Sequence, residues 1–256
     1  MKKTIIILIA LVAAFSCNRQ ANKDNNMKNN IELIKAPAAV GLGTLDISFH
    51  QPVALYRTEN DETPVDMLFF KRSWSGVWHY KTKLLKSFQP YIMFGGDSNK
   101  EAKEHIRGGL IRFPPALSFR VLEVNDDYYR VVLDENSFET VVIRKKADYA
   151  VLPQRDLFGY PSLPKDKPYK GYYIYETWEH LLLRAENVYF NDNYTVYDAP
   201  EGIAVFENTE SDRFKIIEIS GDWIKIQEKE KDSPESWVKW KNETKILVKI
   251  IEFSIE

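Results

Sequence analysis

Cysteine is almost absent from this chain, because Cys17 is the only one among its 256 residues. A single cysteine cannot form a disulfide within the chain, although an exported protein would meet oxidising conditions. If Cys17 serves as a membrane anchor, no cysteine is left to act as a nucleophile. The sequence therefore excludes a disulfide-stapled scaffold and argues against a cysteine-dependent enzyme.

Histidine is also scarce, and the motifs of common catalytic and metal sites are missing. The chain contains neither a His-Glu-x-x-His zinc motif nor a Gly-x-Ser-x-Gly nucleophile motif. It also has no Gly-rich phosphate loop and no basic stripe of the kind that binds nucleic acid. We therefore expect no catalytic residue, no metal, no cofactor and no nucleic-acid partner. The four histidines are His50, His79, His105 and His180.

The N-terminus has the pattern of a targeting segment. Two lysines precede an uninterrupted apolar run, residues 5–15, which is too short to span a bilayer and ends at Ser16-Cys17. This pattern resembles a bacterial lipoprotein signal, in which the cysteine after a small residue is lipidated and becomes the new N-terminus. The resemblance implies that residues 1–17 are a signal peptide and lipobox with Cys17 lipidated. The alternative is an ordinary signal peptide cut near Ala14.

The segment after Cys17 predicts how the folded part is attached. Residues 18–30 are rich in Asn and Lys and lack apolar periodicity, so we expect a disordered tether. A lipid anchor would place the folded part outside the cytoplasm, in the periplasm or on the cell surface. Without the two lysines of the signal, 33 basic residues face 37 acidic ones, which is too small an excess to select the charge of a ligand.

A long internal repeat dominates the rest of the sequence. Residues 119–152 return without a gap as residues 214–247, at a constant spacing of 95. A second match, at a spacing of 141, aligns residues 46–56 with 187–197. The difference between the two spacings means that the first copy carries about 46 extra residues. We therefore predict two copies of one small domain.

Both copies consist of short β-branched and aromatic runs separated by turn residues, which is typical of strands. The clearest hairpin pairs residues 214–219 with 223–227 around Gly221, since glycine adopts a positive φ readily. Alternation along the second strand of each hairpin predicts which side chains face the core. The predicted inward residues are Ile224 and Ile226 in the second copy, and Tyr129 and Val131 in the first.

Three short strings in the second copy resemble bacterial SH3-like (SH3b) domains. They are Gly-Asp-Trp-Ile-Lys-Ile at 221–226, Ser-Trp-Val at 236–238, and Val-Tyr-Asp-Ala-Pro at 196–200, which is similar to the family's first strand and RT-like loop. The resemblance covers residues 187–250 and reaches the first copy through the repeat. It implies a mainly β fold of two SH3-like small barrels, each five-stranded and partly open. Family members usually bind cell wall or peptides, often beside a peptidoglycan hydrolase domain that needs a cysteine–histidine pair.

These observations predict a domain organisation. An SH3-like domain 1 spans residues 31–152, a Pro-rich linker follows at 153–170, and an SH3-like domain 2 spans 171–256. The extra residues of domain 1, about 60–115, are placed in its RT-like loop. This insertion is rich in aromatic residues, which suit recognition. The alternative is that its aromatics cap the barrel or bury the interface between the copies.

The candidate ligand-binding residues come from the insertion and from the repeated hairpin. Tyr128 and its counterpart Trp223 occupy the polar face of their strands, where aromatic-lined SH3 grooves hold extended peptides. The alternative is that Trp223 packs beneath the RT-like loop. Two arginines of the first copy can hold a carboxylate. The full set is Trp74, Trp78, Tyr91, Tyr128, Trp223, Arg72 and Arg112.

The function predicted from these features is that of a non-catalytic cell-envelope lipoprotein. Its tandem SH3-like domains would bind a peptide, peptidoglycan or another envelope protein. One alternative is an envelope hydrolase whose site lies in the domain 1 insertion and uses carboxylates with His79 or His105. Another is a structural spacer. An open aromatic groove favours binding, whereas a pocket with converging titratable groups favours catalysis.

Overall fold

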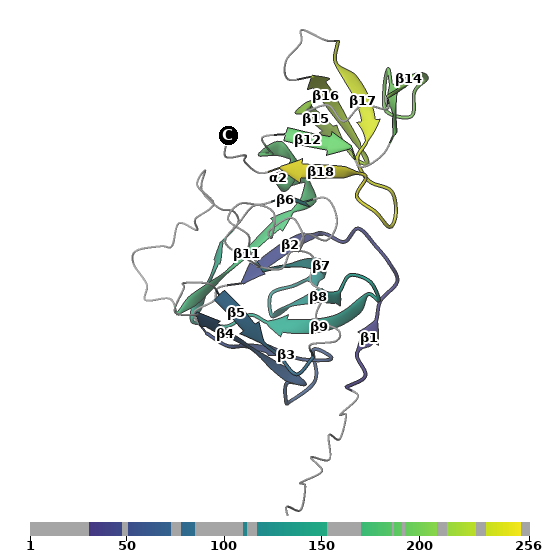
Figure 1. Cartoon of the computed structure of the whole chain (residues 1–256). Helices are drawn as coiled ribbons and strands as arrows, with labels where there is room; N and C mark the ends of the chain where they lie inside the picture. Colours follow the sequence, from purple (N-terminus) through teal and green to yellow (C-terminus); the bar gives the residue numbers. More distant parts are fainter. Residues whose placement is uncertain are drawn as a thin grey trace, which may run out of the picture. The chain divides into compact units, whose positions relative to one another are not determined.

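The chain is mainly β, as its short β-branched and aromatic runs predict (Figure 1). In the part that the structure describes, three sheets are accompanied by one short helix, α2 (Trp178–Leu183). No helix of that part has the length and apolar content needed to cross a membrane. The computed structural model describes residues 31–47, 51–72, 78–84, 110–111, 117–152, 170–185, 187–190, 193–208, 214–228 and 234–251.

The first sheet has seven strands in the order β1-β9-β8-β7-β2-β11-β10. Neighbouring strands are antiparallel, except that β10 and β11 run parallel. The strands are β1 (Ile34–Lys35), β2 (Gly43–Ile47), β7 (Ser118–Val124), β8 (Tyr128–Asp134), β9 (Glu139–Arg144), β10 (Tyr149–Leu152) and β11 (Gly171–Thr177).

The second sheet has eight strands in the order β14-β13-β17-β16-β15-β12-β18-β6, and the third has the order β3-β4-β5. In the second sheet only the β18–β6 pair is parallel. Its strands are β6 (Leu110–Ile111), β12 (Asn187–Phe190), β13 (Tyr194–Tyr197), β14 (Ala204–Asn208), β15 (Phe214–Ser220), β16 (Trp223–Glu228), β17 (Ser236–Lys239) and β18 (Val248–Ile251). The third sheet contains β3 (Val53–Leu55), β4 (Asp66–Arg72) and β5 (Trp78–Lys81).

The repeat at a spacing of 95 corresponds to the same three-stranded meander in both large sheets. Strands β7, β8 and β9 pair in sequence, and so do β15, β16 and β17. Both first hairpins contain a register shift at the same place, between Val121 and Glu123 in one and between Ile216 and Glu218 in the other. A shared β-bulge bends the two meanders alike.

The residues predicted to face inward are buried, although Val132 and Leu133, farther along β8, are both buried as well. Tyr129, Val131 and Ile224 are fully buried, and Ile226 is 3% exposed. The fourth segment of the repeat differs between the copies. In the first copy it forms β10, which pairs with β11, whereas residue 246 of the second copy makes only an isolated bridge to Lys241 and β18 begins at residue 248.

At the start of each copy, two consecutive strand segments contact opposite edges of the meander. In the second copy β12 pairs with β15 at one edge, and the next strand along the chain, β13, pairs with β17 at the other through Tyr197 and Trp237. In the first copy β2 pairs with β7, and Tyr56 forms a bridge to Val142 of β9. Because consecutive strands reach opposite edges of one meander, the sheet must curl into a half-barrel.

The placement of the first copy's extra residues in an RT-like loop at about 60–115 is wrong. Hairpin β3–β4 pairs Leu55 with Asp66, and hairpin β13–β14 pairs Val196 with Phe206, so the two loops differ by a single residue. The extra residues come after β4 and before β7. The sequence repeat shows only that the extra residues lie between the two matched segments. The short β3–β4 hairpin shows that they come after β4 and not within the β3–β4 loop. The residues directly after this loop form a hairpin of their own, because β4 pairs with β5 from Phe69 to Arg72.

The strand after the predicted linker belongs to the first sheet. Residues 171–177 were placed in domain 2, but β11 pairs along its length with β2. It lies next to β2 as β18 lies next to β12. The boundary between the copies is therefore not at residue 171. Strand β11 belongs to the first sheet, and the strands of the second copy begin after α2. The Pro-rich segment 153–169 lies outside the described residues.

Helix α2 joins the two sheets through buried contacts. Thr177 caps it by accepting a hydrogen bond from the His180 amide at 3.2 Å. Its Trp178 packs in the core of the second sheet, and its indole donates to the Val40 carbonyl at 3.0 Å. Arg120 of the first sheet donates to that same carbonyl at 2.7 Å. The segment before β2 is therefore held by both copies.

Candidate functional site

An aromatic pair marks the candidate site in the second copy. Tyr197 is the last residue of β13 and Trp223 is the first residue of β16. Their ring centroids lie 4.9 Å apart and the rings are nearly perpendicular, at 84°. Both side chains are only partly buried, so each keeps a surface that a ligand can contact.

The turn before Trp223 fixes the position of its ring. Gly221 has a φ of +57°, a left-handed conformation that glycine adopts without strain. Trp240 holds this turn from behind: its backbone amide donates to the Asp222 carbonyl at 3.0 Å, and its indole donates to the Gly221 carbonyl at 2.9 Å. Trp240 and Trp237 are both buried, although they are three residues apart and would point to opposite faces of one regular strand. The reason is that Trp240 lies beyond the end of β17, where alternation no longer applies.

The loop after Tyr197 is held by its own hydrogen bonds. The Asp198 carboxylate accepts from the Ile203 amide at 2.8 Å, and the Gly202 amide donates to the Ala199 carbonyl at 2.9 Å. A side chain at Gly202 would lie 2.2 Å from the Asp198 carboxylate, so only glycine fits there. The loop therefore presents Glu201 at a defined place.

A first cavity lies between this loop and the Gly221 turn. It has a volume of about 430 Å³ and is lined by Pro200 and Glu201 on one side and by the 220–223 turn on the other. Trp223 forms part of its wall. Two exposed carboxylates, Glu201 and Asp222, also line it. Asp222 lies 3.6 Å from the Lys241 ammonium, which partly balances its charge.

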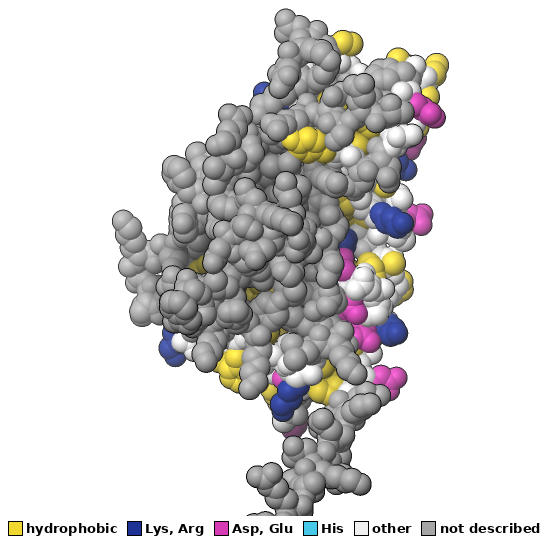
Figure 2. All heavy atoms as spheres, viewed as in Figure 1, with side chains coloured by type: hydrophobic (Ala, Val, Ile, Leu, Met, Phe, Trp, Pro, Cys, Tyr) yellow, Lys and Arg dark blue, Asp and Glu magenta, His cyan; other side chains and the backbone are white. Residues whose placement is uncertain are grey.

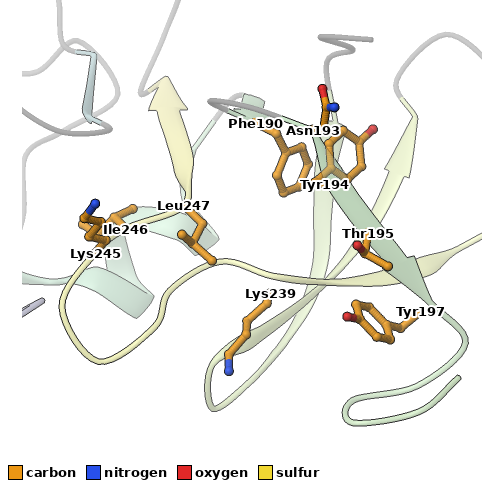
Figure 3. Close-up of a pocket in the computed structure, with 9 residues that line it drawn as sticks. All are labelled: Phe190, Asn193, Tyr194, Thr195, Tyr197, Lys239, Lys245, Ile246 and Leu247. Carbon is orange, nitrogen blue, oxygen red and sulfur yellow. The ribbon is translucent and has the colours of Figure 1, made fainter. Parts of the chain in front are cut away.

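A second cavity, of about 340 Å³, lies on the other side of Tyr197 (Figure 3). Its walls come from β13 and from the loop that precedes β18. The Asn242 side chain shapes that loop by accepting from the amides of Thr244 at 3.0 Å and Lys245 at 2.8 Å. The lining residues are Phe190, Asn193, Tyr194, Thr195, Tyr197, Lys239, Lys245, Ile246 and Leu247.

The two cavities lie beside the aromatic pair, and together they are called the second-copy groove below. Tyr197 lines one cavity, Trp223 lines the other, and the two rings are in contact. Lys239 belongs to the same junction, because it pairs with Trp223 across β16 and β17 and its ammonium lies 5.9 Å from the Trp223 ring.

In the first copy the counterparts of the groove residues are engaged in contacts with the β3–β4 loop. Tyr56 and Arg144 are the counterparts of Tyr197 and Lys239. The Arg144 guanidinium stacks 4.0 Å from the centroid of the Tyr56 ring and donates to the carbonyls of Glu59 and Asp61 in the β3–β4 loop. These contacts tie the loop to β9.

A second set of charges ties the same loop to β8. Arg130 lies 2.8 Å from the Glu59 carboxylate and 3.0 Å from the Glu123 carboxylate. Tyr128, the counterpart of Trp223, donates its hydroxyl to Glu123 at 2.5 Å. Hydrogen bonds from Tyr128 and then Arg130 lower the pKa of Glu123, and the hydrogen bond to Glu123 raises the pKa of Tyr128. The Tyr128 hydroxyl is thus engaged within its own sheet.

Three substitutions between the copies account for this difference. At a spacing of 141, Glu59 corresponds to Pro200, so the second copy's loop lacks the carboxylate that Arg130 binds in the first. Lys225, the counterpart of Arg130, instead pairs with Glu235 at 2.7 Å, and this contact raises its pKa. Arginine binds carboxylates and carbonyls through a planar fork, which the Arg144 counterpart Lys239 cannot do.

Most candidates from the insertion fall where side chains are not described. Trp74, Tyr91, Arg112 and Cys17 lie outside the described residues, and their predicted roles stay predictions. Arg72 and Trp78 are paired residues of the neighbouring strands β4 and β5, and their side chains are not described.

Sequence reasoning found only Trp223 among the residues that line the second-copy groove, and it missed Tyr197 and three of the charged residues used below. Tyr197 stands in the Val-Tyr-Asp-Ala-Pro string that carried the family resemblance, so a signal for it was present. The others depend on which side chains meet in space, and no local pattern marks them. They are Lys239, Lys245 and Glu201.

Neither a metal site among the described residues nor a match to a known protein points to a function. Among them, no group of three His, Cys, Asp or Glu side chains is arranged to hold a metal ion. On the face shown in Figure 2, the described basic and acidic side chains are interspersed. Searches against protein-family models, curated proteins and solved structures each gave no match to this chain.

Proposed function

We propose that this protein is a non-catalytic lipoprotein of the cell envelope, anchored through Cys17, with two SH3-like domains. In this proposal the second-copy groove binds an extended segment of a peptide, of peptidoglycan or of another envelope protein. The observation that carries the proposal is the contrast between the copies. Cavities lie beside Tyr197 and Trp223, whereas in the first copy Arg130, Arg144 and Glu59 contact one another and tie the corresponding loop to the meander.

Strand pairing supports the SH3-like assignment. Each copy has a three-stranded meander with a bulge at the same place. In each copy, two consecutive strand segments before the meander pair with its opposite edges. In the second copy β18 adds a fifth strand beside β12. One cavity of the groove lies between the loop after β13 and the first turn of the meander, and SH3-like domains bind extended ligands in aromatic-lined grooves.

The chemistry of the groove favours binding of an extended chain over catalysis. Two partly exposed rings offer flat apolar surfaces, and polar groups at both ends can fix a ligand's orientation. Glu201 and Asp222 line one cavity together, as a pair of catalytic carboxylates would. Both are exposed, and Asp222 has a lysine beside it, whereas a general acid needs burial to keep its proton near neutral pH.

The first copy has a different role in this proposal. Its sheet is completed by β11, and its Arg120 helps to hold the Val40 segment against α2. Arg120 also forms a two-pronged ion pair with Glu135, at 2.8 to 3.1 Å, with both side chains less than a tenth exposed. We assign the first copy the role of a rigid support that positions the second.

The test compares matched aromatic truncations in the two copies. Trp223→Ala and Tyr128→Ala would be made in the full chain, and retention would be measured on purified peptidoglycan and on envelope extract. A central tryptophan is typically worth 2 kcal/mol or more, so Trp223→Ala should weaken retention about thirtyfold. Tyr128→Ala should leave retention unchanged. Circular dichroism and thermal unfolding confirm that both variants fold.

Two outcomes would contradict the proposal. Unchanged retention of a folded Trp223→Ala variant would exclude the second-copy groove as the binding site. Loss of retention only with Tyr128→Ala would move the site to the first copy. Variants of Trp74 and Trp78 to Ala, tested in the same way, determine whether the insertion contributes a second aromatic surface.

A further inference from the structure

The two ends of the second-copy groove carry opposite charges. The cavity beside β13 is lined by Lys239 and Lys245, and no acidic residue is among its lining. The cavity beside the Gly221 turn is lined by Glu201 and Asp222, with no basic residue among its lining. The Tyr197–Trp223 pair separates the two ends. The groove therefore has a cationic end, an aromatic middle and an anionic end.

These charges are carried by backbone that is fixed in place. Lys239 is the last residue of β17 and faces Trp223 in the neighbouring strand. The amide of Lys245 is bound by the Asn242 side chain. Glu201 has a φ of +57° at the tip of a loop that Asp198 closes. Neither Glu201 nor Lys245 has an ion-pair partner among the described residues.

We infer that the second-copy groove selects a zwitterionic peptide, with a carboxylate at Lys239 and an ammonium group at Glu201. The apolar section between the two charges would cross the Tyr197–Trp223 rings. This inference rests on the proposed binding function and adds the charge and orientation of the ligand. Asp222 contributes less than Glu201, because Lys241 already lies beside it.

The first copy shows the same charges satisfied internally. There Arg130 binds Glu59, and Arg144 binds the carbonyls of the loop, so acid and base neutralise each other across the corresponding space. In the second copy Lys225 forms an ion pair with Glu235 instead. The carboxylate of the loop belongs to Glu201, the residue after Pro200, which is the counterpart of Glu59. A ligand with both charges would supply the partners that the chain itself supplies in the first copy.

The probe is a matched set of synthetic peptides with one lysine and one free C-terminus. The N-terminus is acetylated, the lysine is followed by one to four alanines, and the chain ends in a carboxylate. Each peptide has two controls, one with a C-terminal amide and one with an acetylated lysine. Binding to the full-length protein is measured by Trp fluorescence at low and high salt.

The zwitterionic peptide of best length should bind more tightly than either control. An exposed charge pair is worth about two- to fivefold in affinity, and salt should reduce the preference. Lys239→Gln should remove the preference for carboxylate over amide. Glu201→Gln should remove the preference for ammonium over acetyl-lysine. Lys215→Gln and Glu207→Gln change exposed charges that line neither cavity, so they should keep both preferences.

The outcomes separate this inference from the proposed function. If all the peptides bind alike, or none binds, while Trp223→Ala still abolishes retention on envelope material, the charge selection is wrong and the groove remains the binding site. If Trp223→Ala has no effect on retention, the proposed function itself fails. If Lys215→Gln removes the carboxylate preference as strongly as Lys239→Gln, the selection reflects net charge and the inference is overturned.

Discussion

The hydroxyl of Tyr129 is buried in the first sheet without a hydrogen-bond partner, which gives a sharp prediction for Tyr129→Phe. The residue is fully buried, and its hydroxyl contacts no polar partner in the described structure. Its ring lies 5.7 Å from Tyr173 and 6.0 Å from Tyr175. Burial, and then the nearby Tyr175, raise the pKa of Tyr129 to about 12.

Removing this hydroxyl should stabilise the protein at neutral pH. A buried polar group without a partner costs about 1–3 kcal/mol, and phenylalanine fills the same space without that cost. We therefore expect the free energy of unfolding to rise by about 1 kcal/mol at pH 7. The measurement is urea denaturation followed by Trp fluorescence, with Tyr175→Phe as a control at a neighbouring, partly exposed tyrosine.

The same substitution should change how stability depends on alkaline pH. The pKa of Tyr129 is about 10 in the unfolded chain and about 12 in the folded one, so the unfolded chain loses its proton first. Stability due to this group is complete below pH 10 and is lost as the pH rises toward 12. The loss amounts to about 1.4 kcal/mol at pH 11. The advantage of Tyr129→Phe over the natural protein should grow by that amount.

Two results would refute this reasoning. A Tyr129→Phe variant that is less stable than the natural protein at pH 7 would mean that the hydroxyl makes a favourable hydrogen bond. Parallel stability curves between pH 9 and pH 11 would mean that Tyr129 ionises equally in both states.

Three further predictions test the fold and the anchor. Ile224→Ala opens a cavity in the core of the second sheet and should cost about 2–5 kcal/mol in urea denaturation; a smaller cost would mean that this face is not core. Gly43→Ala places a methyl group 1.9 Å from the Glu176 carbonyl and should cost more than about 3 kcal/mol, whereas Gly221→Ala meets open space and should cost about 1–2 kcal/mol for its positive φ alone. Cys17→Ala should move the protein from the membrane fraction to the soluble fraction, and continued membrane fractionation would contradict lipidation.

Local patterns in the sequence predict the meanders of both copies well. Alternation along short strands identified the buried faces of Tyr129 and Ile224, because a strand's side-chain period is local and independent of its partners. The gapless repeat predicted that equivalent strands pair in the same order. The β-bulge after Val121 recurs after Ile216, so the repeat includes this irregularity of strand pairing.

Non-local pairings could not be predicted in the same way. β11 joins β2, and β6 joins β18 in the second sheet, across long stretches of chain. A strand carries no local signal for the partner that it selects at such a distance. The position of the extra residues was wrong for a related reason, since the matched segments do not show where the short β3–β4 hairpin ends.

The candidate site was only partly predictable. Trp223 was identified because an aromatic side chain on the polar face of a strand is unusual. The difference between an open and a filled groove was not visible, because it depends on whether Glu59 or Pro200 meets a cation across the loop. Such a contact joins residues 71 positions apart, as in the Glu59–Arg130 pair.

The most direct test of the account is to follow the indole N–H signals of the protein by nuclear magnetic resonance during a titration. The titrant is the envelope component that retains the protein, either soluble peptidoglycan fragments or an extracted partner. The account predicts that the Trp223 signal shifts, whereas the signal of Trp178, which is buried and bonded to Val40, stays in place. A shift confined to Trp74 or Trp78, with Trp223 unmoved, would contradict the second-copy groove and place the binding site in the first copy's insertion.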